Sequence, residues 1–225
     1  MTNLSVKNVI KVYKTGKLEV IALQGVTFDA RSGELVVLRG PSGSGKTTLF
    51  NLLACLDRPT AGSIRLDDTS VQDLSDQALE KYLATTVGVV FQAFNLISSF
   101  TALENVVFPM LLATKKVPEA RGRAEELLER VGMGQRKDHE PRELSGGEQQ
   151  RVAIAVALAN DPPVVLADEP TAELDSKTGQ FVVEMLRDQA HDEKKLVLVA
   201  THDETIAALA DRSLRLHDGR IVDSA

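Results

Sequence analysis

Apolar and polar positions alternate along the first part of the chain, a pattern typical of β-strands with one buried face. Residues 4–12 and 20–28 carry this alternation together with β-branched side chains. A further strand is predicted at residues 63–67, directly after a turn at residues 59–62. We therefore expect an antiparallel β edge subdomain at the start of the chain.

Three later segments are almost continuously apolar, which predicts strands buried on both faces, as parallel strands are. They are residues 34–39, 164–167 and 196–200. Apolar side chains at helical spacing predict helices at residues 47–56, 120–131, 149–159 and 178–189. Asp218 and Gly219 predict a hairpin turn near the end. Strands alternating with helices predict an α/β fold with a mainly parallel sheet.

The length of 225 residues is enough for one large domain, and we assign residues 1–225 to a single domain. The region from residue 79 to residue 133 indicates a helical insertion. We place the resulting helical subdomain at roughly residues 92–160 of the core.

Composition excludes several classes of protein. No apolar run approaches the roughly 18–20 residues of a membrane span, and Pro109 interrupts the run at residues 106–113. Residues 1–7 are polar and lack an apolar signal core, so we expect a cytoplasmic protein without direct membrane insertion. A net charge of -6 argues against nucleic-acid binding. Cys55 is the only cysteine and is expected to be a small buried hydrophobe in a helix.

A glycine-rich segment between the predicted strand at 34–39 and the predicted helix at 47–56 matches the phosphate-binding P-loop, G-x-x-x-x-G-K-S/T. Glycines let backbone N–H groups approach phosphate oxygens, and the helix adds its positive N-terminal end. Lys46 is expected to bind the β and γ phosphates, and Thr47 to bind Mg²⁺. The predicted binding residues here are Gly40, Pro41, Ser42, Gly43, Ser44, Gly45, Lys46, Thr47 and Thr48.

Two acids end the apolar strand at 164–167, at the edge of the sheet where α/β proteins bind their ligands. Asp168 is expected to hold Mg²⁺, usually through water. Glu169 is expected to orient or deprotonate the attacking water. Two acids alone are more often a solvated strand end or a helix cap, but together with the P-loop they favour the catalytic interpretation.

The segment Leu144-Ser145-Gly146-Gly147-Glu148-Gln149-Gln150-Arg151 resembles the signature motif of the ABC ATPase family. Ser145 and the amides of Gly146 and Gly147 stand at the start of a predicted helix, a natural anion site. In the family, this site caps the γ-phosphate held by the P-loop of the opposite subunit. The resemblance extends over essentially the whole chain.

Other segments resemble elements of the same family in the same order. Tyr13 resembles the aromatic residue that stacks on adenine, although alone it would more often be an edge-strand tyrosine. Gln92 resembles the glutamine that senses Mg²⁺ and the membrane partner. Residues 172–175 resemble the D-loop that crosses the dimer interface, and His202 resembles the histidine that contacts the γ-phosphate.

The resemblance implies a homodimer, packed head to tail around two ATP molecules with Mg²⁺, that drives integral membrane permease subunits from the cytoplasmic side of the inner membrane. One chain would provide the P-loop, Tyr13, Gln92, Asp168, Glu169 and His202, and the other would provide Ser145, Gly146 and Gly147. The implied catalytic residues are Glu169, His202, Gln92 and Lys46, and the implied metal ligands are Thr47, Gln92 and Asp168.

Within the family, residues 12–16, 56–60, 91–96 and 103–106 resemble the subgroup for lipoprotein release and macrolide export, the MacB/LolD-like systems. This subgroup implies export or the extraction of lipoproteins or lipids. Two positions depart from the family pattern. Val156 stands where members commonly have arginine, and Glu173 where many have a small or amide residue.

Several alternatives can be weighed from the sequence. DNA-repair members need a long coiled coil, but only about a hundred residues separate Thr48 from Leu144. Translation-factor members usually carry two cassettes, whereas this chain has one P-loop. A switch GTPase is disfavoured by the signature motif and by the lack of an Asn-Lys-x-Asp guanine reader. An ATPase that signals through a membrane partner in cell division or cell-wall control stays open.

Overall fold

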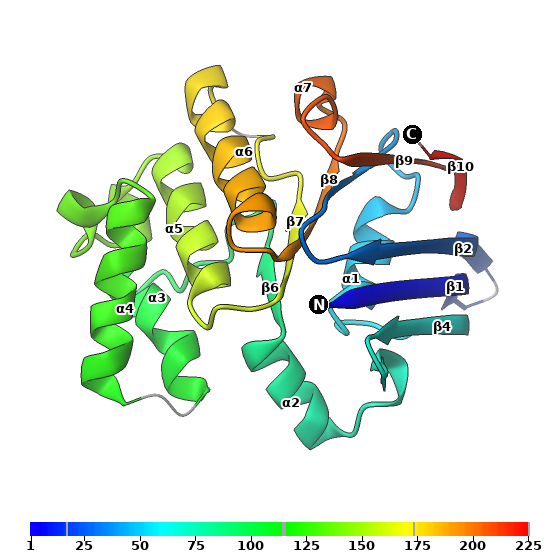
Figure 1. The fold of residues 1–225 in the computed structure, drawn as a ribbon, viewed down its shortest axis with the longest axis horizontal. Helices are drawn as coiled ribbons and strands as arrows, with labels where there is room; N and C mark the ends of the chain where they lie inside the picture. Colours follow the sequence, from blue (N-terminus) through cyan, green and yellow to red (C-terminus); the bar gives the residue numbers. More distant parts are fainter. Residues whose placement is uncertain (17, 114–115, 173, 225) are drawn as a thin grey trace.

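A six-stranded sheet forms the centre of the protein in the computed structural model, which describes residues 1–16, 18–113, 116–172 and 174–224 (Figure 1). Its strand order is β10-β9-β3-β8-β7-β6, and only β10 runs antiparallel to its neighbour. The predicted mainly parallel sheet is confirmed. The strands are β3 (Leu35–Arg39), β6 (Val87–Val90), β7 (Val164–Asp168), β8 (Leu196–Thr201), β9 (Arg212–His217) and β10 (Arg220–Ser224).

A second, antiparallel sheet with the order β2-β1-β4-β5 confirms the predicted β-rich start. The backbone N–H of Gln24 donates to the carbonyl oxygen of Gly219 at 2.8 Å, so the two sheets are joined by a main-chain hydrogen bond. The strands are β1 (Asn3–Thr15), β2 (Leu18–Arg31), β4 (Ala61–Leu66) and β5 (Thr69–Ser70).

Helices α3, α4 and α5 form a group apart from the other helices (Figure 1). Figure 1 shows α3, α4 and α5 together at the end of the molecule opposite the antiparallel sheet. These three helices follow β6 and precede β7 in the chain. Among the described residues, no helix is both long enough and apolar enough to cross a membrane. The helices are α1 (Lys46–Leu53), α2 (Asp76–Thr85), α3 (Ala102–Leu112), α4 (Val117–Arg130), α5 (Gly146–Leu158), α6 (Ser176–His191) and α7 (Glu204–Ala207), with 3-10 turns at Val71–Asp73, Gly134–Arg136 and Pro141–Glu143.

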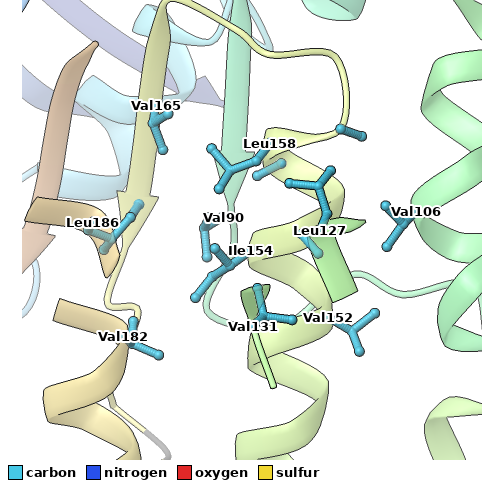
Figure 2. Close-up of a cluster of buried hydrophobic side chains, with 14 of the residues drawn as sticks. Val90, Val106, Leu127, Val131, Val152, Ile154, Leu158, Val165, Val182 and Leu186 are labelled. Atoms are coloured by element: carbon cyan, nitrogen blue, oxygen red, sulfur yellow. The ribbon is translucent and has the colours of Figure 1, made fainter. Parts of the chain in front are cut away.

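The central sheet separates two hydrophobic cores. In β3, Leu35 and Val37 belong to one core and Val36 and Leu38 to the other. This division follows from the two-residue period of a strand, and it explains why the sequence of β3 is apolar throughout. The first core extends to α4, α5 and α6 (Figure 2), and the second is covered by α1 and the antiparallel sheet.

The expectation that Cys55 lies in a helix was wrong, whereas its packing as a small hydrophobe is confirmed in part, since it lies partly buried against the second core. α1 ends at Leu53, three residues before the predicted end, and Cys55 has a φ of 55° that a helix does not accommodate. Its side chain is half-buried, and its Sγ lies 3.7 Å from the carbonyl oxygen of Val71. Burial raises the pKa of this thiol to about 11, so Cys55 is an unreactive thiol at neutral pH.

The predicted helical insertion at residues 79–133 needs a correction, because β6 lies inside it and pairs with β7 in the central sheet. β6 has only four residues, and Gly88 stands in its middle. A Cβ atom at Gly88 would clash with the carbonyl oxygen of Ala157 in α5, so the glycine allows strand and helix to approach closely.

Candidate functional site

The P-loop connects β3 to α1 and encloses the ammonium group of Lys46. Gly43 and Gly45 have φ values of 78° and 106°, which residues with a Cβ rarely adopt. The Nζ of Lys46 donates to the carbonyl oxygens of Gly40 at 2.8 Å and Pro41 at 3.3 Å. Pro41, Ser42 and Gly43 are exposed, so the loop opens to solvent at the N-terminus of α1. This arrangement is an anion-binding site for phosphate groups.

Glu169 lies beside Lys46. Its Oε1 is 3.5 Å from the Nζ of Lys46, and both side chains are largely buried, with 13% and 8% of their surface exposed. Glu169 has a φ of 46°, an unfavourable value for a residue with a Cβ. Its backbone N–H donates to the carbonyl oxygen of Ala200 at 2.8 Å, and this bond to β8 helps hold the strained backbone.

The second carboxylate oxygen of Glu169 has partners from the end of β8. The Nδ1 of His202 lies 2.9 Å from Oε2, and the Thr201 hydroxyl donates to Oε2 at 3.2 Å. The carboxylate is therefore fixed between Lys46 on one side and two residues of β8 and its following loop on the other. Thr201 was not predicted as a site residue, although it immediately precedes the predicted His202.

Asp168 ends β7 with only 9% of its surface exposed, and its Oδ1 is buried without a hydrogen-bond partner among the described residues. Burial raises the pKa of this carboxyl, and the Glu169 charge acts in the same direction, whereas the Thr47 hydroxyl and Lys46 act against them. The unpaired carboxylate oxygen of Asp168 and the nearby hydroxyl of Thr47 are oxygen ligands of the kind that a hard cation such as Mg²⁺ prefers.

Nothing in the described part of the chain groups three or more His, Cys, Asp or Glu side chains that could hold a metal by themselves. A cation at Asp168 and Thr47 therefore needs phosphate oxygens and water to complete its shell, as Mg²⁺ usually does beside nucleotides. Gln92 is exposed just beyond β6, and its part in metal binding stays a prediction.

The sheet topology brings most predicted site residues to one edge. β3, β8 and β7 are parallel neighbours, so their carboxyl ends place the P-loop, His202 and the Asp168–Glu169 pair side by side. β6 pairs with β7 and brings Gln92 toward the same edge. Ligands of open α/β sheets bind at this edge.

Ser145 has its polar contacts elsewhere, in the first turn of α5. Its Oγ accepts from the N–H of Glu148 at 3.3 Å, while the N–H of Ser145 donates to Oε2 of Glu148 at 2.9 Å. The Ser145 backbone and hydroxyl hydrogen bonds lower the pKa of Glu148, so this reciprocal cap is ionised at neutral pH. Within the described residues, the amides of Gly146 and Gly147 have no acceptor, which leaves two N–H groups directed out of the helix.

Tyr13 lies on β1 and is 38% exposed. Its hydroxyl donates to Asp57 Oδ2 at 2.9 Å, and the Lys11 ammonium lies 4.8 Å from its ring centroid. Asp57 and Lys11 were not predicted as site residues. Asp57 belongs to the segment 56–60, which drew attention only through its family resemblance.

The predicted D-loop is described in part. Asp175 caps α6 by accepting from the backbone N–H groups of Lys177 at 3.0 Å and Thr178 at 3.1 Å. Glu173, one of the two departures from the family pattern, lies outside the described residues.

A P-loop at the end of a buried strand, with an acid pair at the same end of a second parallel strand of the sheet, defines a P-loop nucleotide hydrolase. The sequence matches the ABC transporter family over residues 23–172. The chain belongs to this family, as an ATP-binding ATPase subunit.

Individual relatives agree with this assignment. The chain is 47% identical over 214 residues to an uncharacterized ABC transporter ATP-binding protein of Thermotoga maritima, covering 95% of this chain and 91% of that protein. It is 45% identical over 221 residues to the lipoprotein-releasing system ATP-binding protein LolD of Pseudomonas syringae pv. tomato, covering 98% of this chain and 97% of that protein. The predicted resemblance to the LolD-like subgroup is confirmed.

Solved structures of ATP-binding cassettes have the same fold as this chain. A dimeric structure of the ATP-binding cassette MJ0796 of Methanocaldococcus jannaschii, in a post-hydrolysis state bound to ADP and Pi, superposes with a TM-score of 0.93. That chain is 43% identical in sequence, and the match covers 99% of this chain and 97% of the other. The predicted α/β P-loop ATPase fold is confirmed.

Proposed function

We propose that two copies of the chain pack head to tail and hydrolyse ATP at two sites, each composed of residues from both copies. The free amides of Gly146 and Gly147 carry this proposal. They form an anion site on α5, while Lys46, Glu169 and Asp168 form another at the sheet edge. A second copy can bring its α5 terminus to the phosphates held by the first. The dimeric state of the MJ0796 cassette supports this arrangement.

Each side chain has one proposed part in hydrolysis. Lys46 binds the β and γ phosphates, and Glu169 orients the attacking water and accepts its proton as the γ-phosphorus separates from the bridging oxygen to give ADP and phosphate. His202 keeps Glu169 in place and contacts the γ-phosphate. Mg²⁺, held by Asp168, Thr47 and Gln92, supplies positive charge at the phosphates when bound.

Mixing two inactive variants tests whether the sites are shared. Lys46→Ala disables a P-loop, and Ser145→Arg blocks a signature site. In a mixed dimer, both defects meet in one site and leave the other site intact. We expect each variant alone to lack ATPase activity and an equimolar mixture to recover part of it. The control is that both variants are folded and that each binds nucleotide as its substitution predicts. If the mixture is then as inactive as either variant alone, the sites are not shared.

We also propose that the protein works on the cytoplasmic face of the membrane against a separate integral membrane permease. A groove of about 230 Å³ beside the edge strand β6 supports this, since its lining includes Phe91, which precedes Gln92, and exposed Leu83. Val156 also lines this groove. An apolar residue there, in place of the usual arginine, favours an apolar helix of the partner as occupant.

The phenylalanine-rich segment at residues 91–108, beside Gln92, contributes to this proposed docking region through its exposed side chains and not through Phe94 and Phe100. Both are half-buried, and Phe100 packs edge-to-face on Phe108 with ring centroids 5.7 Å apart. The exposed members are Ile97 and Phe108, at 36% and 39%.

The driven process that we propose is export or the extraction of lipoproteins or lipids from the membrane. The relative LolD, named for lipoprotein release, supports this over a signalling role. The test is the identity of the membrane protein that copurifies with the tagged chain and stimulates its ATPase activity. A partner without a transported substrate would contradict the proposal.

A further inference from the structure

The aromatic ring of Tyr13 is held through its hydroxyl, which contacts Asp57 and Thr48, and through one of its faces. Its hydroxyl donates to Oδ2 of Asp57 at 2.9 Å, which fixes the direction of the side chain. The ammonium of Lys11 lies 4.8 Å from the ring centroid, in cation–π contact with one face. Since these contacts act on the hydroxyl and on one face, the opposite face is the part of the ring left to meet a ligand.

Lys11 is committed to internal contacts. Its Nζ donates to Oδ1 of Asp57 at 2.6 Å and to the carbonyl oxygen of Arg58 at 2.8 Å. Only 11% of its side chain is exposed. Lys11 therefore acts as a support behind the ring of Tyr13 and not as a phosphate-binding lysine.

Asp57 joins this support to the helix that carries the P-loop. It follows the C-terminal end of α1, where its backbone N–H donates to the carbonyl oxygen of Asn51 at 3.2 Å. Burial alone would raise the pKa of Asp57, but the hydrogen bonds from Lys11, Arg58 and Tyr13 outweigh it and lower the pKa. The carboxylate is thus charged at neutral pH and accepts from both Lys11 and Tyr13.

We infer that Asp57 is a positioning residue for nucleotide binding, which holds Tyr13 so that the ring face opposite Lys11 receives the adenine. The inference rests on the proposed ATP hydrolysis by this chain and on the stacking of Tyr13 on adenine that the family resemblance implies. β1, which carries Tyr13, and α1, which begins at the P-loop, belong to different layers. Asp57 follows α1 and binds the Tyr13 hydroxyl, so it keeps the base-binding ring at a fixed position relative to the phosphate-binding end of α1. A ring that is already ordered loses less freedom on binding, which is worth roughly two- to tenfold in affinity per side chain.

The experiment compares a ligand with a base and a ligand without one. ATP and inorganic tripolyphosphate both engage the P-loop, but only ATP reaches Tyr13. For Asp57→Ala in the full chain, we expect KM for ATP to rise roughly two- to tenfold with kcat nearly unchanged. The affinity for tripolyphosphate should stay at the wild-type value. Asp138→Ala, which removes an exposed acid in the helical region, is the matched control and should change neither value.

Tyr13→Phe provides a second variant, since it removes the contacts of the hydroxyl with Asp57 and Thr48 but keeps the ring and leaves Lys11 paired with Asp57. It should also weaken ATP and spare tripolyphosphate, and adding Asp57→Ala to it should have less effect than in the wild type. If Tyr13→Phe binds ATP like the wild type while Tyr13→Ala does not, the ring stacks without help from Asp57 and the inference is wrong.

Two further outcomes distinguish the positioning role of Asp57 from the stacking role of Tyr13, on which it depends. If Tyr13→Ala leaves ATP and tripolyphosphate affinities both unchanged, the stacking role itself fails, and the positioning role fails with it. If Tyr13→Ala weakens ATP but a folded Asp57→Ala weakens both ligands equally, Asp57 supports the phosphate site and not the ring. That result overturns the inference and leaves the stacking role in place.

Discussion

The Nζ of Lys46 lies 3.5 Å from Oε1 of Glu169, so the side chain proposed to bind phosphates and the one proposed to activate water are each other's counter-ions. A triphosphate that reaches Lys46 has to compete with this carboxylate. The same contact therefore opposes nucleotide binding and holds the carboxylate proposed to accept the proton beside the proposed phosphate-binding ammonium.

Replacing Glu169 by glutamine should separate binding from hydrolysis. Glu169→Gln keeps the shape of the side chain but removes the charge, so hydrolysis should fall by on the order of 10²–10⁴-fold. ATP affinity should hold or rise because Lys46 loses a competing carboxylate. Size-exclusion chromatography with Mg-ATP should then detect a lasting dimer. Glu184→Gln, on the exposed face of α6, should hydrolyse ATP normally, and a strictly monomeric Glu169→Gln protein at saturating ATP would contradict the shared-site arrangement.

The buried carboxylate of Asp168 should lower the free energy of unfolding of the ligand-free protein at neutral pH. Burial raises its folded pKa, so the folded protein binds more protons than the unfolded chain between the two pKa values, and stability falls as pH rises through that window. Asp168→Asn should remove this penalty. Its free energy of unfolding should equal or exceed that of the wild type at pH 7, and the difference should disappear below the unfolded pKa of about 3.9.

Denaturant unfolding at several pH values measures the effect, and the shift in melting temperature on adding Mg-ATP is the companion measurement. Asp168→Asn should lose most of the Mg-dependent part of that shift. A variant that is less stable than the wild type at pH 7 would mean that Asp168 holds the fold together and is not kept for a cation.

Polar substitution beside the β6 groove should uncouple the two parts of the transporter. Leu83→Asp and Phe108→Asp each place a charge at an exposed apolar position, where a docked helix would have to bury it. Basal ATPase activity of the isolated chain should survive, while copurification with the membrane protein should fall. Leu18→Asp on β2 is the control, since Leu18 is 72% exposed on the antiparallel sheet. Wild-type copurification of both Leu83→Asp and Phe108→Asp would place the docking surface elsewhere.

Asn105 should prove important for order in the phenylalanine-rich segment. It is 4% exposed, its Oδ1 accepts from the N–H of Ile97 at 2.7 Å, and its Nδ2 donates to the carbonyl oxygens of Phe100 and Thr101 at 3.1 and 3.0 Å. Asn105→Ala should destabilise the protein by about 1–3 kcal/mol, the cost of unpaired buried polar groups. Urea unfolding gives the energy, and amide exchange at residues 97–101 should accelerate. Gln135→Ala, at an exposed position, should change neither.

The strands that carry the site could be predicted because burial on both faces leaves an unbroken apolar pattern, as in β3, β7 and β8. The start of α5 could not be located as well. Apolar spacing placed it at Gln149, whereas the signature motif placed it at Ser145 to Gly147. The helix begins at Gly146, since the reciprocal cap between Ser145 and Glu148 sets the first turn in spite of two glycines. β6 was missed because four residues with a central glycine carry too little periodicity.

The P-loop, Asp168 and Glu169 could be predicted because each belongs to a short contiguous motif. Asp57 and Asn105 could not be assigned their structural parts, since the contact of Asp57 with Tyr13 spans 44 positions in the chain and that of Asn105 depends on how the 97–101 loop folds back. Contacts between distant segments leave no local pattern for sequence reasoning to detect.

Both hydrogen-bonded neighbours of β3 are made late in biosynthesis. β3 leads into the P-loop, yet it pairs with β8 (Leu196–Thr201) on one side and β9 (Arg212–His217) on the other. A ribosome that has translated residues 1–195 has therefore produced the phosphate loop without either strand that flanks its supporting strand. Nascent chains should therefore be unable to capture ATP until β8 and β9 have been made and have paired with β3.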